Sequence, residues 1–160
     1  MRAGVVLLAL FPLPVMADCL PGGQVFSCQI GAKTLEVCNE TETLIYSFGP
    51  PGAPELLIAE PLASVAFQPW PGVGSSIWES VTFTNQGYSY EVVTSVERDS
   101  TAPEDLQGAV YVLQNDSIVA ELTCDPGTAS NSLDVVWDLK ESIGQCYEFA
   151  SQSWQYTCNN

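Results

Sequence analysis

Residues 81–96 read VTFTNQGYSYEVVTSV, and this stretch decides the fold. Apolar and polar side chains alternate on both sides of Asn85-Gln86-Gly87, first at Val81 and Phe83 and then from position 88 to position 96. Strict alternation is typical of a half-buried strand, and a short polar, glycine-containing interruption between two such strands indicates a tight turn. The stretch therefore predicts an antiparallel hairpin at the centre of a β domain.

Shorter strand signals lie on both sides of this hairpin. Residues 34–37 and 43–48 alternate, residues 55–59 and 65–67 follow, and residues 109–113 and 118–124 form a last predicted hairpin. Many short strands joined by tight turns are typical of antiparallel sandwiches and barrels. We therefore expect a mostly β fold, an antiparallel barrel or sandwich of about seven or eight short strands.

The pattern changes near the C-terminus. Over residues 133–143, Val136, Leu139, Lys140 and Ile143 recur at helical spacing, and Gly144 follows in the position that commonly ends a helix. This predicts one short C-terminal helix that packs against the sheet and is held by the cysteine that follows it.

The first seventeen residues have the order of a secretory signal peptide. Arg2 supplies the positive charge, an apolar run follows, and Ala17 closes a small-residue cleavage site. The run is too short for a retained membrane anchor, and no later segment resembles a membrane span. We expect residues 1–17 to be removed, leaving residues 18–160 as a single exported domain, periplasmic or extracellular.

Six cysteines lie in the mature part, and an even number behind a signal peptide indicates disulfides. Cys146 and Cys158 are the natural pair, because they close a short C-terminal loop by themselves. The remaining four are expected to tie the N-terminal segment to Cys38 and Cys124, although other pairings remain compatible with the sequence. The predicted disulfide cysteines are Cys19, Cys28, Cys38, Cys124, Cys146 and Cys158.

The charge is strongly negative. The full sequence carries four basic and nineteen acidic residues, and loss of Arg2 with the signal peptide changes its formal net charge from −15 to −16. Such a charge repels nucleic acids and anionic lipid surfaces and favours cationic partners such as a lysozyme. It is also a common source of solubility in exported proteins.

The chain contains no histidine, which excludes catalytic triads and metal sites that are built on that residue. The cysteines are better assigned to disulfides than to metal, so we predict no catalytic residue, no metal and no cofactor. Paired carboxylates are the remaining catalytic option, as in glycoside hydrolases. Glu79 and Glu91 lie on the two arms of the central hairpin and are the candidate pair.

The segment from Pro69 to Glu79 is the best candidate for recognition. It combines tryptophans with glycines that let another chain approach and with serines that can hydrogen-bond, a composition used by protein interfaces and sugar-binding surfaces. Alternatively, Trp78 belongs to the core and Trp70 closes the end of a barrel. We expect Trp137 and Trp154 to pack the helix and the C-terminal loop. The candidate binding residues are Trp70, Gly72, Gly74, Ser75, Ser76 and Trp78.

Three segments carry a resemblance to a group of small exported bacterial proteins of unknown function. They are IGAKTLEVC at residues 30–38, WPGVGSSIWE at residues 70–79 and LTCDPG at residues 122–127. The resemblance covers most of the mature chain and implies no activity.

The expected architecture also resembles, more distantly, the periplasmic c-type lysozyme inhibitors. These are small disulfide-bonded antiparallel barrels that insert a Ser/Gly-rich loop into the cleft of the enzyme. The resemblance places Gly74-Ser75-Ser76 in the position of that loop. The inhibitors continue with a tyrosine and later a lysine, whereas this chain continues with Ile77, Trp78 and Glu79.

Together these observations predict an exported, non-enzymatic domain that binds a protein or a glycan through residues 70–78, with lysozyme inhibition as the most concrete version. The alternatives are a structural domain of the cell envelope and, third, a carboxylate-dependent glycoside hydrolase.

Overall fold

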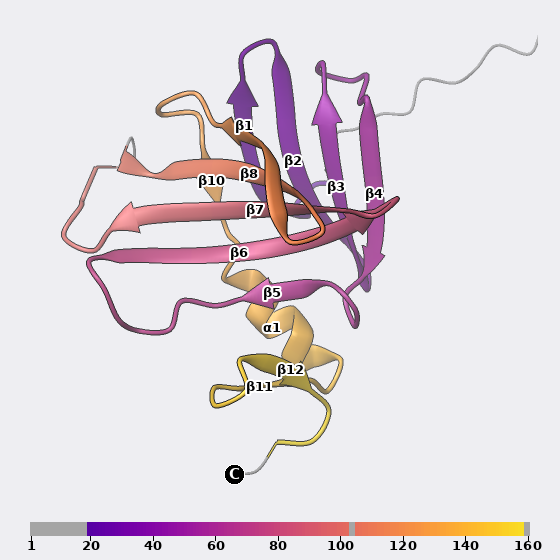
Figure 1. The fold of residues 1–160 in the computed structure, drawn as a ribbon, viewed down its shortest axis with the longest axis vertical. Helices are drawn as coiled ribbons and strands as arrows, with labels where there is room; N and C mark the ends of the chain where they lie inside the picture. Colours follow the sequence, from indigo (N-terminus) through magenta and orange to yellow (C-terminus); the bar gives the residue numbers. More distant parts are fainter. Residues whose placement is uncertain (1–18, 103–104, 159–160) are drawn as a thin grey trace, which may run out of the picture.

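The computed structural model describes residues 19–102 and 105–158, so the predicted signal peptide lies outside the described residues. Two five-stranded antiparallel sheets make up most of the molecule (Figure 1). In spatial order, the first sheet consists of β10 (Ser130–Asn131), β1 (Gln24–Ile30), β2 (Lys33–Glu40), β3 (Thr43–Gly49) and β4 (Leu56–Pro61). The second consists of β5 (Ala66–Gln68), β6 (Ser76–Asn85), β7 (Tyr88–Glu97), β8 (Gln107–Gln114) and β9 (Ser117–Thr123).

The two sheets face each other as a sandwich and do not close into a barrel. In Figure 1 the strands of the first sheet run upright and those of the second cross them steeply. Helix α1 (Val135–Ser142) and a small hairpin of β11 (Cys146–Glu148) and β12 (Ser153–Gln155) lie beyond β5. The mostly β, antiparallel prediction is confirmed. The predicted number of strands was too low, because β1, β10, β11 and β12 were not recognised.

The central hairpin forms as the sequence predicts. Val81 pairs with Val92 and Asn85 with Tyr88, so the turn consists of two residues. Both turn residues have positive φ, 51° at Gln86 and 81° at Gly87. Two successive positive φ values are characteristic of the tight turn that matches the twist of a hairpin.

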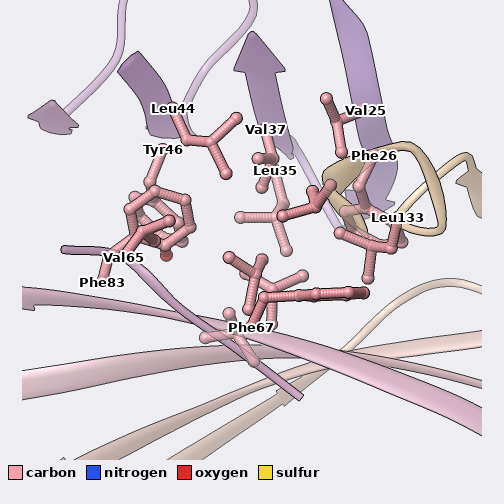
Figure 2. Close-up of a cluster of buried hydrophobic side chains, with 14 of the residues drawn as sticks. Val25, Phe26, Leu35, Val37, Leu44, Tyr46, Val65, Phe67, Phe83 and Leu133 are labelled. Atoms are coloured by element: carbon pink, nitrogen blue, oxygen red, sulfur yellow. The ribbon is translucent and has the colours of Figure 1, made fainter. Parts of the chain in front are cut away.

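The core lies between the two sheets (Figure 2). Tyr46 of the first sheet meets Phe83 of the second, with ring centres 5.6 Å apart. Burial of such apolar side chains is the main stabilising contribution to the fold. The side chains at 1% exposure or less from these strands include Phe26, Leu35, Val37, Leu44, Tyr46, Val81, Phe83, Val92 and Val110.

Disulfides join the sheets and the chain ends. Cys28 of β1 is bonded to Cys124, which directly follows β9, and this bridge links the two sheets across 96 positions of sequence. Cys19 is bonded to Cys38, and Cys146 to Cys158. The pairing agrees with the prediction. By constraining the unfolded chain, a bridge over such a long loop contributes up to about 4–5 kcal/mol of stability in the chain-entropy model.

Gly108 allows the sheets to approach closely beside this bridge. A β-carbon at that position would lie 2.7 Å from the Sγ atom of Cys124 and 2.8 Å from the ring of Phe26. These distances are shorter than non-bonded contacts allow. The absence of a side chain at Gly108 is therefore a packing requirement.

Helix α1 is slightly shorter than the predicted span of residues 133–143. Gly144 follows it with φ of 85°, and its backbone N–H donates to the carbonyl oxygen of Glu141. A glycine with positive φ just after the last turn is a common way for a helix to end. Cys146 then begins β11, so the helix is held by a disulfide as expected.

Candidate functional site

The predicted recognition segment forms the long connection between β5 and β6 and the start of β6 (Figure 1). Residues 71–75 are all exposed to solvent. Val73 keeps 67% of its surface accessible, which is unusual for a valine in a folded domain. The segment is therefore displayed on the surface and contributes little to the core.

Arg98 holds this loop in one shape. Its guanidinium carbon lies 5.2 Å from the centre of the Trp70 ring, and its Nη1 donates to the carbonyl oxygen of Gly74 at 3.2 Å. The backbone N–H of Arg98 donates to the carbonyl of Ser75 at 2.9 Å. Within the loop, Nε1 of Trp70 donates to the carbonyl of Val73 at 3.0 Å. We call residues 70–75, fixed by these contacts, the Arg98-held loop.

The glycines of the loop are needed for its backbone. Gly72 has φ of 82° and Gly74 has φ of 97°, a region that L side chains rarely adopt. No atom lies within 4 Å of a β-carbon built at either position. The backbone conformation therefore explains why glycine occupies both positions. The open space beside them is available to a partner.

The two serines differ. Ser75 is exposed, whereas Ser76 is half-buried and its Oγ donates to Oε1 of Glu97 on the neighbouring strand at 2.8 Å. A shallow hollow of about 330 Å³ lies beside Ser75, Glu97 and Arg98. Ser75 is thus the serine that is open to a partner, while Ser76 anchors the start of β6.

Trp78 lies away from the loop. It faces outward on β6, on the opposite side of the sheet from Val81 and Phe83, and it is half-buried. It lines a groove of about 490 Å³ that runs along β5 to the C-terminal hairpin. The structure therefore places four of the six predicted binding residues in the Arg98-held loop, Ser76 at the start of β6 and Trp78 in a second place. The alternative that Trp78 belongs to the core is wrong.

This second place, which we call the β5 groove, collects residues distant in sequence. Strands β6 and β7 supply Trp78, Ser80, Thr82 and Glu91, and the C-terminal hairpin supplies Trp154. The hairpin is fixed to β5 by a hydrogen bond of 2.8 Å from Nε1 of Trp154 to the backbone carbonyl of Phe67.

A buried lysine lies behind the groove. Lys140 of α1 is 1% exposed, and its ammonium group donates to the carbonyl of Leu62 at 2.9 Å and to Oε1 of Gln145 at 3.1 Å. It also lies 5.4 Å from the centre of the Trp154 ring. Burial lowers the pKa of Lys140 to about 8, and the charge of Glu60 opposes this effect only in part. The arrangement ties the helix to the segment between β4 and β5.

Trp137 and Trp154 pack where they were expected. Their ring centres are 5.0 Å apart with an edge-to-face geometry, and Trp137 also contacts Tyr147 of the hairpin. Phe67 of β5 contacts the ring of Trp154 in a tilted geometry, with ring centres 6.1 Å apart. This aromatic cluster fixes α1 and the C-terminal hairpin to each other and to the sandwich.

The central carboxylates do not form a catalytic pair. Glu79 pairs with Thr94, whereas Glu91 pairs with Thr82, so the two carboxylates project from opposite faces of the sheet. Burial, and secondarily the charge of Asp134, raises the pKa of Glu79 to about 7. No described cavity contains both carboxylates.

Within residues 19–102 and 105–158, no cluster of three or more acidic or cysteine side chains is arranged to hold a metal ion. None of the helices in this part of the chain has the length and apolar character needed to cross a membrane. All six cysteines are in disulfides.

Comparisons with protein-family models, with curated proteins and with solved structures give no significant match for this chain.

Proposed function

We propose that the protein is an exported, non-enzymatic binding domain that presents its Arg98-held loop to a cationic protein. Inhibition of a c-type lysozyme is the most concrete version of this proposal. Three disulfides support the exported setting, since such bonds persist mainly in oxidising compartments.

The observation that carries the proposal is an exposed loop whose shape is already fixed. Arg98 contacts the loop in three ways, through the ring of Trp70 and the carbonyls of Gly74 and Ser75. A loop ordered before binding loses little conformational entropy on association, and this increases the affinity that its contacts can provide. Rigid, protruding loops of this kind suit insertion into an enzyme cleft.

Charge supports a cationic partner. Lys33 pairs with Glu55, Arg98 is engaged with the loop, and Lys140 is buried, so each basic side chain of residues 19–158 is used within the molecule. The acidic groups are left to dominate the surface potential. Such a field increases the association rate with a basic protein.

The alternatives receive less support. A purely structural domain does not require an exposed loop that carries Val73 and two glycines with positive φ. A hydrolase requires two carboxylates in one cleft, and Glu79 and Glu91 lie on opposite faces of the sheet.

The test is a titration of lysozyme activity with the oxidised mature chain at low and at physiological salt. Val73→Ala/Ser75→Ala truncates two of the exposed loop side chains without touching the Arg98 contacts. Ser117→Ala/Val119→Ala on β9 is the matched control, because it removes the same two side-chain types at exposed positions on another strand.

Stoichiometric inhibition that persists at physiological salt, and that the loop variant loses but the control keeps, is the expected result. Inhibition only at low salt would reflect unspecific charge attraction. Absence of inhibition at both salt concentrations eliminates lysozyme as the partner.

A further inference from the structure

Three polar side chains in the β5 groove have no partner in the described part of the protein. Ser80 is only 2% exposed, yet no described residue hydrogen-bonds to its hydroxyl group. Thr82 and Glu91 face each other across β6 and β7, and neither side chain takes part in an observed hydrogen bond or ion pair. Among the described residues, the one fully buried side-chain polar atom without a partner is Oδ1 of Asn39, so the Ser80 hydroxyl is open to the groove. Thr82 and Glu91 are half-buried, and all three groups are therefore free to hydrogen-bond to a ligand in the groove.

Trp78 stands beside these groups. Among the described residues its ring makes no aromatic or cation–π contact, whereas Trp70, Trp137 and Trp154 all do. Its ring is half-buried on the outer face of the sheet, two positions from Ser80. The groove therefore contains a large apolar ring without a stacking partner next to unpaired hydroxyl and carboxylate groups.

The opposite wall is rigid and offers a further acceptor. Trp154 is locked by its hydrogen bond to the backbone of Phe67. The amide nitrogen of Gln68 donates to the hydroxyl of Tyr147 at 2.7 Å and to the carbonyl of Pro69 at 3.2 Å. The amide nitrogen is thus engaged, whereas no described residue donates to the carbonyl oxygen of Gln68, which lines the groove.

The charges of the groove exclude anionic ligands. Among the described residues that line it, the carboxylate of Glu91 is the only unpaired charged group, since the ammonium group of Lys140 is held by Leu62 and Gln145. An incoming carboxylate, sulfate or phosphate would therefore meet repulsion with no compensating cation. A long aliphatic chain would leave the hydroxyl groups of Ser80 and Thr82 unpaired.

We propose that the β5 groove binds a neutral oligosaccharide. A pyranose ring has an apolar C–H face that can stack on Trp78 and a rim of hydroxyl groups that can bond to Ser80, Thr82 and Glu91. The groove volume of about 490 Å³ lies in the range of small-ligand sites. This inference is independent of the protein-binding role of the Arg98-held loop, because the two places share no side chain.

The test is calorimetric and fluorescence titration of the oxidised mature chain with three neutral tetrasaccharides and one anionic tetrasaccharide. The neutral probes are β-1,4-linked glucose, β-1,4-linked N-acetylglucosamine and α-1,4-linked glucose, and the anionic probe is α-1,4-linked galacturonate. We expect saturable binding of at least one neutral probe and none of the anionic probe. The tryptophan emission should change on binding, because Trp78 becomes covered.

Two groove variants locate the binding. Trp78→Ala should weaken it about tenfold or more, as loss of a buried aromatic contact predicts. Ser80→Ala should weaken it a few-fold, and it tests the groove even if Trp78→Ala does not fold, because the lost hydroxyl has no hydrogen-bond partner among residues 19–102 and 105–158. Tyr156→Ala removes an exposed aromatic ring outside the groove and should leave binding unchanged.

Four results would overturn the proposal. The first is the absence of saturable binding of every neutral probe at millimolar concentration. The second is binding that both groove variants retain at full strength. The third is binding of the galacturonate probe at least as tight as that of the neutral ones. The fourth is loss of sugar binding in Val73→Ala/Ser75→Ala, which would move the site to the loop. Lysozyme inhibition does not enter any of these readouts, so the two proposals fail separately.

Discussion

Arg98 lies over the indole ring of Trp70, with its guanidinium carbon 5.2 Å from the ring centre. The same side chain donates a hydrogen bond to the carbonyl of Gly74, so one residue directly after β7 fixes a loop that precedes β6. Removal of this side chain should loosen the loop while the sandwich stays intact, since none of its contacts reaches the core.

Arg98→Ala should therefore accelerate cleavage next to Val73 by elastase, a protease with a small specificity pocket, several-fold. The free energy of unfolding should fall by about 1 kcal/mol or less, the typical contribution of an exposed cation–π contact. Limited proteolysis and urea unfolding measure the two effects. Unchanged cleavage together with lowered global stability would contradict the assignment of Arg98 to the loop.

Gly108→Ala should destabilise the protein by about 1–3 kcal/mol, the usual effect of overpacking a core. The new methyl group would come within 2.8 Å of the Phe26 ring and 2.7 Å of the Cys124 sulfur. Phe26→Leu in the same chain should recover part of the loss by vacating space, and a double-mutant cycle measures this coupling. Additive effects of the two substitutions would show that the crowding lies elsewhere.

Lys140→Met should lower stability by about 1–3 kcal/mol at neutral pH, because the carbonyl of Leu62 and the amide oxygen of Gln145 lose their donor. The wild type should also gain stability as pH rises from about 8, since a pKa lowered by folding makes the unfolded chain bind more protons there. Urea unfolding between pH 7 and pH 9.5 is the measurement. The variant should lack this rise.

Glu79→Gln should remove a decline of folding stability with rising pH, whereas Lys140→Met removes a rise. Folding raises the pKa of Glu79 to about 7, so ionisation of this group opposes the folded state. The contribution is most favourable below the ordinary pKa of about 4.5 and is lost as pH rises to about 7. Thermal unfolding at pH 4, 5.5, 7 and 8 should show a smaller decline in the variant than in the wild type. Glu121→Gln, on the exposed face of β9, is the charge-matched control.

The alternation of apolar and polar residues was sufficient to predict the strands in which that alternation is regular. The hairpin around Gln86 and Gly87 was predictable because the two turn positions and both flanking strands agree. Strand β1 was missed because its register shifts near Gln24, so that Val25 and Phe26 are both buried although they are neighbours. A bulge of this kind removes the alternation on which sequence-based assignment depends.

The candidate sites could also be predicted only in part from the sequence. Exposure of the segment that contains Val73 follows from its prolines and glycines, but its contacts with Arg98 depend on the pairing of β6 with β7. The β5 groove could not be predicted, because Trp78 and Trp154 are brought together only by the packing of the C-terminal hairpin. The sequence pattern did indicate the burial of Lys140, because this residue falls on the apolar side of the predicted helix.

The bridge between Cys28 and Cys124 turns the intervening chain into a covalent ring. The exposed loop around Val73 lies inside that ring, as do both strands of the central hairpin. A protease that cut the loop once would open the peptide chain but leave the two pieces joined through the disulfide. A chain nicked in this loop would thereby remain one molecule, and only reduction would release the fragments.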